Sequence, residues 1–112
     1  MSHELPIEID VATLDEMRKN GDDFVLLDVR EQTEYETARI EGSVLLPMSE
    51  LTDRIEELDP YREKLMVIHC HHGGRSMRVL QALRNYGFEK MQNLAGGIDQ
   101  WSVEIDPEVP RY

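Results

Sequence analysis

Short apolar runs alternate along the chain with segments whose apolar residues recur every three or four positions. Five runs rich in β-branched or aliphatic residues predict strands: residues 7–9, 24–29, 44–46, 65–68 and 91–94. The run at 24–29 is apolar at nearly every position, which is typical of a strand buried on both faces of a parallel sheet. The pattern predicts an α/β fold with a central, mostly parallel five-stranded sheet and helices on both faces.

Helical spacing fills the segments between these runs. Asp10 is the predicted N-cap of the first helix, which ends at Asn20-Gly21. A short helix is predicted for residues 31–38. Ser49 is the predicted cap of the next helix, which we expect Pro60 to end.

Two glycine pairs precede the last two helices. After Gly73-Gly74, we expect a helix whose inner stripe extends to Tyr86 and whose C-cap is followed by Gly87. Gly96-Gly97 is interpreted as a strand-to-helix turn, and the helix after it carries Trp101 into the core.

The length of 112 residues predicts a single domain over residues 1–112, with an irregular tail at 106–112. The 12 Lys and Arg against 23 Asp and Glu give a net charge of −11, which disfavours binding to nucleic acids or anionic membranes. No apolar run approaches the roughly 18–20 residues of a membrane span, and residues 1–8 lack the pattern of a secretory signal. We therefore expect a soluble, cytoplasmic protein.

The single cysteine, Cys70, excludes an intramolecular disulfide and a multi-cysteine metal site. We predict no bound metal and no cofactor. Cys70 lies in a window, residues 64–88, that holds none of the 23 acidic residues. A local positive field of this kind favours a thiolate or an anionic substrate. A buried strand followed by a half-buried helix lacks acids equally well, so charge alone does not decide between these interpretations.

In parallel sheets, chemistry lies beyond the carboxyl ends of the strands, where Asp28–Arg30 and Cys70 fall. The loop after Cys70 contains Gly73-Gly74, which favours backbone N–H groups pointing inward around an anion. The next helix adds about half a positive charge at its N-terminus, and Arg75 adds a full one. Cys70 is therefore predicted to be a thiolate nucleophile, and Ser76 either donates a hydroxyl to the same anion or caps the helix.

Other interpretations apply to the residues around the loop. Most free cysteines are small buried hydrophobic residues, although the context of Cys70 argues against that role. Adjacent His71 and His72 do not easily face one ion, so we expect them to line the rim of an anion-binding site. His69 is expected to point into the core.

Three motifs in order resemble the rhodanese homology domain in its single-domain form, from about Ile7 to Trp101. They are Leu27-Asp28-Val29-Arg30 with Glu34-Tyr35 and Ile40-Glu41-Gly42-Ser43, then Cys70-His71-His72-Gly73-Gly74-Arg75-Ser76, and finally Asn93-Leu94-Ala95-Gly96-Gly97-Ile98 with Trp101. The chain has Ala38-Arg39-Ile40 where the family commonly has Gly-His-Ile, a change expected to affect local packing more than chemistry.

The resemblance implies a sulfurtransferase. Cys70 would take the outer sulfur of thiosulfate or a related small anionic donor, form a persulfide, and pass the sulfur to cyanide or a thiol, including a protein thiol. The loop of His71, His72, Gly73, Gly74, Arg75 and Ser76 would bind the anion, with Arg75 also lowering the thiol pKa. Asp28 and Arg30 occupy the family's positions for an ion-pair network that braces the loop, and Glu34 is the candidate third member. The alternative interpretation of Asp28 and Arg30 is a solvated strand end.

Loop length bears on a neighbouring activity. Four residues separate Cys70 from Arg75, whereas the related phosphatases have five, which makes room for a phosphate or arsenate group. A phosphatase or arsenate reductase is therefore disfavoured. A sulfur-relay or interaction module that serves a dedicated protein partner is the main alternative, and an inactive binding domain is disfavoured by the intact cysteine.

Overall fold

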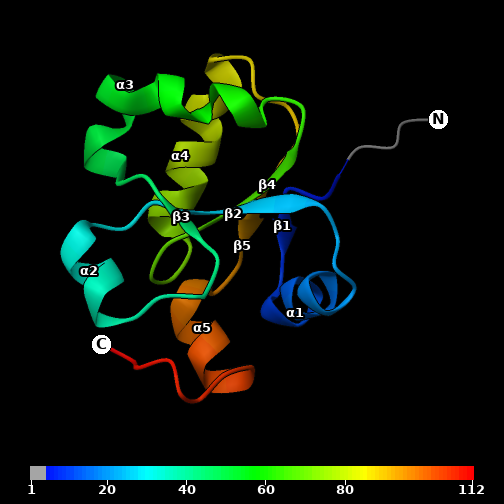
Figure 1. Ribbon diagram of the computed structural model, residues 1–112, viewed down its shortest axis with the longest axis vertical. Coiled ribbons are helices and arrows are strands. Elements are labelled where there is room, and N and C mark those ends of the chain that lie inside the picture. The colour runs from blue at the N-terminus through cyan, green and yellow to red at the C-terminus, as the bar shows by residue number, and fades with distance from the viewer. Residues whose placement is uncertain (1–4) are drawn as a thin grey trace.

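The computed structural model of the chain describes residues 5–112 and contains one five-stranded sheet (Figure 1). The strand order is β1-β5-β4-β2-β3, and every neighbouring pair is parallel. The strands are β1 (Glu8–Ile9), β2 (Phe24–Asp28), β3 (Val44–Leu45), β4 (Leu65–His69) and β5 (Met91–Leu94). The predicted α/β fold is confirmed, and the sheet is entirely rather than mostly parallel. The first four residues of the predicted domain lie outside the described residues.

Helices connect the strands as the alternating pattern predicts. They are α1 (Val11–Lys19), α2 (Gln32–Thr37), the 3-10 helix η1 (Met48–Glu50), α3 (Leu51–Arg54), the 3-10 helix η2 (Ile55–Tyr61), α4 (Gly74–Asn85) and α5 (Gly97–Glu104). The predicted caps are confirmed at two ends. The Asp10 carboxylate accepts a 2.8 Å hydrogen bond from the Thr13 N–H, and Gly87 follows the C-cap of α4 with φ of +94°.

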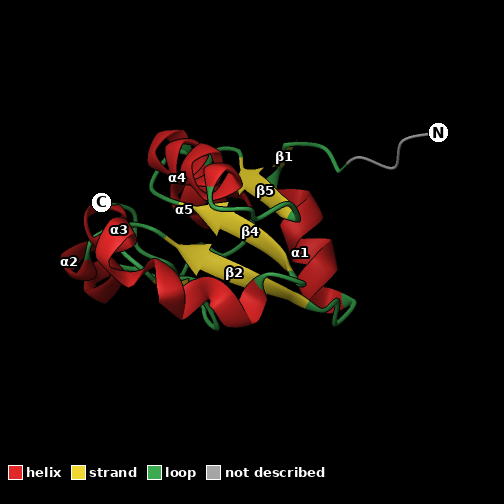
Figure 2. Cartoon of the chain, turned by 90° about the horizontal axis from the view of Figure 1, so that it is seen from above, coloured by secondary structure: helices red, strands yellow, loops and turns green. Residues whose placement is uncertain are grey.

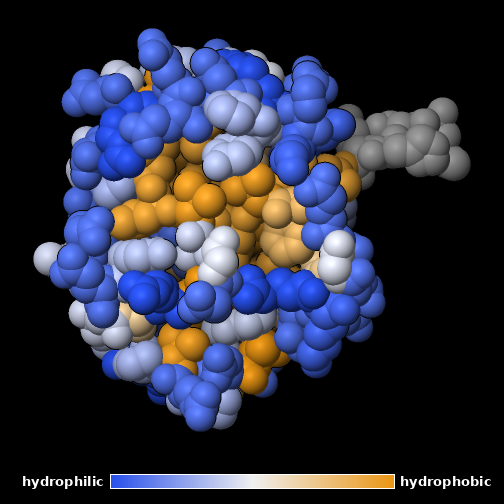
Figure 3. Space-filling model, viewed as in Figure 1, coloured by the Kyte–Doolittle hydropathy of each residue, from blue (hydrophilic) through white to orange (hydrophobic). Residues whose placement is uncertain are grey.

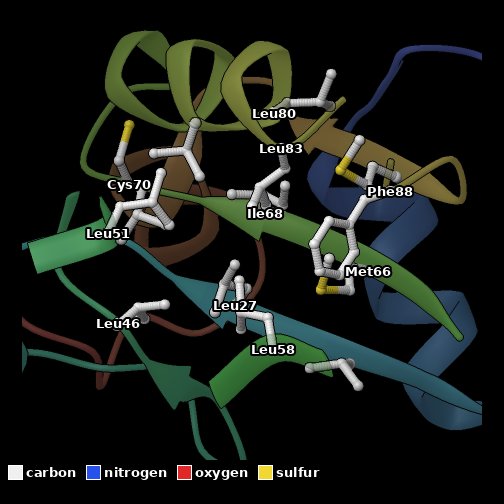
Figure 4. Packing of buried hydrophobic residues seen from close by; sticks show 14 residues of the cluster. Leu27, Leu46, Leu51, Leu58, Met66, Ile68, Cys70, Leu80, Leu83 and Phe88 are labelled. Carbon is white, nitrogen blue, oxygen red and sulfur yellow. The ribbon is translucent and has the colours of Figure 1, made fainter. Parts of the chain in front are cut away.

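Two layers of helices cover the sheet, with α3 and α4 on one side and α1 and α5 on the other (Figure 1). One face packs against α3, η2 and α4 through a cluster that includes Leu27, Ile68 and Leu80 (Figure 4). The other face packs against α1 and α5, where Val67 and Trp101 belong to a second cluster. Because side chains alternate between the faces of a strand, neighbouring residues of β4 reach opposite layers.

The surface of the molecule is mostly polar around an apolar centre on one face. Apolar side chains gather over the middle of the face shown in Figure 3, and polar residues surround them. Within residues 5–112, no helix is long and apolar enough to cross a membrane.

The single helix predicted after Ser49 is wrong. The segment folds as three short helices, Ser49 lies inside η1, and Pro60 lies inside η2 instead of ending it. The Ser49 hydroxyl donates to the Glu31 carboxylate at 2.8 Å rather than capping a helix. A three-residue spacing of apolar positions fits a 3-10 turn as well as an α-helix, so the sequence pattern does not separate them.

Two predictions near helix ends have different outcomes. Tyr86 is not part of the inner stripe of α4. It is the C-cap residue, it is 44% exposed, and its carbonyl accepts a hydrogen bond from Arg62. The tail at 106–112 is free of helix and strand, as predicted, but it is not loose. Val109 is buried in the cluster beneath α1 and α5.

Candidate active site

Cys70 lies immediately after β4, at the carboxyl end of the sheet and in the layer beneath α4 (Figure 4). Cys70 is 1% exposed, and hydrogen-bond donors surround its sulfur. The N–H groups of Gly73 and Ser76 lie 3.1 and 3.4 Å from the sulfur, and the Ser76 hydroxyl lies 3.3 Å away. The sulfur therefore lies in a backbone cradle at the start of α4, where the helix dipole also favours negative charge.

The cradle depends on the left-handed conformation of Gly73, whose φ is +113°. This turn brings its N–H toward the sulfur, and glycine adopts it without steric cost. Burial alone would raise the pKa of the Cys70 thiol. The hydrogen bonds from the Ser76 hydroxyl and from the Ser76 and Gly73 N–H groups outweigh it and hold that pKa below its ordinary value.

The loop is supported from beneath by the start of α5. The N–H groups of Ile98 and Asp99 donate to the carbonyls of Cys70 and His71 at 2.9 and 3.1 Å. A Cβ at Gly97 would lie 2.5 Å from both carbonyl oxygens, so only glycine permits this approach. The predicted strand-to-helix turn is confirmed, and it also fixes the position of the loop.

Arg75 makes no hydrogen bond to Cys70 and pairs instead with Glu34. The two nitrogens NH1 and NH2 lie 2.7 and 2.8 Å from the two Glu34 carboxylate oxygens, in a bidentate arrangement. The side chains are 31% and 20% exposed. The Arg75 hydrogen bonds, with help from the Glu31 N–H and Tyr112, lower the pKa of Glu34 to about 2 despite burial. Glu34 is therefore ionised in the folded protein at neutral pH.

Asp28 and Arg30 form a fully buried corner at the end of β2. The Arg30 guanidinium contacts both Asp28 oxygens at 2.7–3.2 Å, and neither side chain is exposed. Its remaining N–H groups donate to the carbonyls of Ala38 and Glu34 and to the Tyr112 hydroxyl at 2.6, 3.4 and 2.9 Å. The corner thus ties β2 to α2, whose Glu34 in turn holds Arg75.

His69 points into the core, as predicted, on the face opposite Cys70. It pairs in register with Asp28, and its Nε2 lies 3.8 Å from the nearer carboxylate oxygen. Within residues 5–112, neither ring nitrogen has a hydrogen-bond partner. Burial lowers the pKa of His69 to about 4, against the opposing effect of Asp28, so the ring is neutral at pH 7.

The two adjacent histidines of the loop, His71 and His72, differ in burial. His71 is half-buried, and burial and the neighbouring His72 lower its pKa. Its ring stacks at 4.0 Å and 10° on the ring of Tyr112, which sequence reasoning did not single out. His72 is exposed, with Nδ1 3.9 Å from an Asp99 oxygen. Nothing in the pattern of the irregular tail signals that Tyr112 returns to the loop.

The structure also places Gly74 and the segment Ala38-Arg39-Ile40, which the sequence singled out near the site. The Gly74 N–H is not among the donors to the sulfur, although Gly74 begins α4. The Arg39 guanidinium lies over the Tyr35 ring, 5.0 Å from its centroid, and Ala38 and Ile40 are buried. Among the described residues, no group of three His, Cys, Asp or Glu side chains is arranged to hold a metal ion.

A cysteine in a short loop before a helix N-terminus, on an all-parallel sheet, invites comparison with known proteins. The sequence pattern of the rhodanese-like domain matches residues 10–104. The chain belongs to the rhodanese-like domain family. This rhodanese-like chain is also similar to the crystal structure of a rhodanese-related protein from Thermoplasma volcanium. The two share 32% sequence identity with a TM-score of 0.78, covering 89% of this chain and 94% of the other.

Curated relatives of this rhodanese-like chain include a small protein and larger ones. It is 37% identical over 81 residues to thiosulfate sulfurtransferase GlpE of Coxiella burnetii, covering 72% of this chain and 74% of the relative. It is 37% identical over 95 residues to Rhodanese-like/PpiC domain-containing protein 12, chloroplastic, of Arabidopsis thaliana, covering 81% of this chain. The match spans 31% of that protein and 20% of adenylyltransferase and sulfurtransferase MOCS3-2 of Zea mays.

Proposed function

We propose that this rhodanese-like chain is a thiosulfate sulfurtransferase type of enzyme that works through a persulfide on Cys70. The single observation that carries the proposal is the cradle around the sulfur. Three donors from Gly73 and Ser76 lie within 3.4 Å of Cys70 Sγ. Such a cradle stabilises a thiolate before the reaction and a persulfide anion after it. The similarity to a small thiosulfate sulfurtransferase supports the same activity.

The reaction has two transfers. In the first, the Cys70 thiolate attacks the outer sulfur of thiosulfate. A new S–S bond forms, the bond between the two thiosulfate sulfurs breaks, and sulfite leaves with its electron pair. In the second, cyanide or a thiolate attacks the terminal persulfide sulfur, and the Cys70 thiolate leaves with the electrons of the broken bond. No external oxidant or reductant is needed.

The surrounding charges suit a small anionic donor. Arg75 keeps N–H groups beyond the two that Glu34 uses, since a guanidinium carries five. These groups are offered to the oxyanion end of the donor, while the N-terminus of α4 favours the thiolate. The half-buried His71 lies at the rim, and its lowered pKa keeps it neutral at pH 7 and above.

The test is the intact mass of the protein after incubation with thiosulfate, without reductant. The wild type should gain one sulfur atom, and Cys70→Ser should gain none. A thermal melt of Cys70→Ser controls for folding. If the wild type gains no sulfur while Cys70 reacts rapidly with an alkylating reagent at neutral pH, the small-donor proposal is wrong.

A sulfur-relay module is the second candidate function. The observation that favours it is the similarity to the larger Zea mays adenylyltransferase and sulfurtransferase, of which this chain matches only a fifth. A relay module would accept sulfur from a protein persulfide and would turn over thiosulfate and cyanide poorly. Steady-state thiocyanate formation separates the two functions. Hydrolysis of a phosphate ester under the same conditions tests the phosphatase alternative, which the short loop argues against.

A further inference from the structure

Residues 106–112 form a strap that lies outside the matched family region, which ends at residue 104. Figures 1 and 2 both place its end beside α2. Several contacts hold the strap against the rest of the fold. The Ser102 hydroxyl donates to the Val109 carbonyl, the Val109 side chain is buried, and the Arg111 guanidinium pairs with Asp99 at 2.9 and 3.2 Å. These contacts bring Tyr112 to the candidate active site.

The Tyr112 hydroxyl connects the two arginine–carboxylate pairs. It accepts a 2.9 Å hydrogen bond from Arg30 and donates a 2.8 Å hydrogen bond to a Glu34 oxygen. Burial is the main cause that raises the pKa of Tyr112 to about 12, so the hydroxyl stays protonated at neutral pH. The positive charge of Arg30 polarises this hydroxyl, which makes it a stronger donor to Glu34.

Glu34 is held by four donors. Arg75 supplies two, the Glu31 N–H supplies one at 3.1 Å, and Tyr112 supplies the fourth. With four donors, the negative charge of Glu34 is shared among its partners. Glu34 therefore neutralises the Arg75 charge less than it would if Arg75 were its only donor. The fourth bond also restricts the carboxylate, so the bidentate plane of Arg75 keeps one orientation.

We propose that Tyr112 is a positioning residue for anionic donors. By holding Glu34, it fixes Arg75 with its unused N–H groups available to an anion that approaches Cys70. The inference rests on the proposed function for the nature of the donor, a small anion that carries sulfur. It assigns this effect to the strap, a segment that the family pattern does not cover.

The test compares two reagents that alkylate Cys70, anionic iodoacetate and neutral iodoacetamide. Their rate ratio reports how well the site attracts an anion, and it cancels changes in thiolate fraction. Tyr112→Phe keeps the ring on His71 and removes only the hydroxyl, and the net charge is unchanged because the phenol is protonated. We expect the ratio to fall about two- to fivefold. This is less than the direct loss of a hydrogen bond to a charged group would give, because the hydroxyl acts on the anion only through Glu34 and Arg75.

Tyr86→Phe is the matched control. Tyr86 is 44% exposed and Tyr112 is 42% exposed, and the Tyr86 hydroxyl forms no hydrogen bond within residues 5–112. This control should leave the ratio unchanged. A ratio in Tyr112→Phe equal to that of the wild type would overturn the inference. A Cys70 that neither reagent modifies would overturn it too, because no anion would then have access to the sulfur.

Turnover of thiosulfate gives an independent measurement. Tyr112→Phe should raise the KM for thiosulfate about two- to fivefold with kcat nearly unchanged, since the hydroxyl acts on donor binding. An equal fall in kcat with constant KM would contradict a positioning role. If the wild type forms no persulfide, the proposed function fails, yet the alkylation ratio still decides the inference.

Discussion

Two arginine–carboxylate pairs lie near the ends of neighbouring strands. They differ in how many arginine N–H groups remain free of protein acceptors. Arg30 follows β2, is fully buried with Asp28, and uses all five N–H groups on protein acceptors. Arg75 follows β4, is 31% exposed, and uses two N–H groups on Glu34. The same pair of groups therefore occurs in two settings. The first pair is enclosed by the fold, and the second keeps N–H groups that the proposed function assigns to an anionic donor.

The largest effect should come from breaking the buried pair. Arg30→Met leaves the Asp28 carboxylate buried without its partner, so the free energy of unfolding should fall by about 3–5 kcal/mol. Arg75→Met removes a partly exposed partner and should cost less than about 1 kcal/mol. Urea unfolding at pH 7 measures both.

A double variant sharpens this comparison. Adding Asp28→Leu to Arg30→Met removes the stranded charge and should recover part of the lost stability. Equal losses from Arg30→Met and Arg75→Met would contradict the distinction between a buried structural pair and a partly exposed pair that adds little stability.

The buried corner should also make stability depend on pH through His69. The unfolded ring takes up a proton near pH 6.5, whereas the buried ring resists until about pH 4. Between these values the unfolded state binds more protons, so the free energy of unfolding decreases as the pH falls. The maximal loss is about 3 kcal/mol. Asp28 opposes this effect, while Arg30 and Arg18 reinforce it.

His69→Asn should remove that part of the pH dependence, and His72→Asn, at an exposed ring, should retain it. Urea unfolding between pH 7 and pH 4.5 gives the slopes. Parallel slopes for the wild type and His69→Asn would show that the buried ring takes up its proton over the same pH range as in the unfolded chain, which would contradict the lowered pKa.

Gly97 and Gly74, on either side of the loop after Cys70 in the fold, differ in the space around them. Gly97→Ala would place a Cβ 2.5 Å from the Cys70 and His71 carbonyl oxygens at a φ of +59°, and should cost about 2–3 kcal/mol. Gly74→Ala meets nothing within 4 Å and should change stability by less than about 1 kcal/mol. Thermal and urea unfolding check both, and a neutral Gly97→Ala would mean that α5 does not support the loop.

Most of the fold followed from local patterns. Strands and helices have different periods, and the alternation of the two specifies a parallel sheet. The cradle was predictable because Cys70, Gly73 and Ser76 are close in sequence. The role of Gly97 was not, because it depends on how α5 docks beneath the loop. Tyr112 was missed for the same reason: the path of an irregular segment carries no periodicity.

Within the loop, Ser76 and Arg75 should have separable effects. Ser76→Ala removes the hydroxyl that lies 3.3 Å from Cys70 Sγ, so the curve of alkylation rate against pH should shift to higher pH. Arg75→Gln removes a charge that the proposed function directs toward the donor and that makes no hydrogen bond to the sulfur. It should raise the KM for thiosulfate about tenfold, a cost of about 1.4 kcal/mol, with a smaller shift of the alkylation curve. If Arg75→Gln shifted the curve more than Ser76→Ala, the arginine rather than the cradle would hold the thiolate. The contrast between an arginine that faces the donor and a cradle that holds the thiolate would then be wrong.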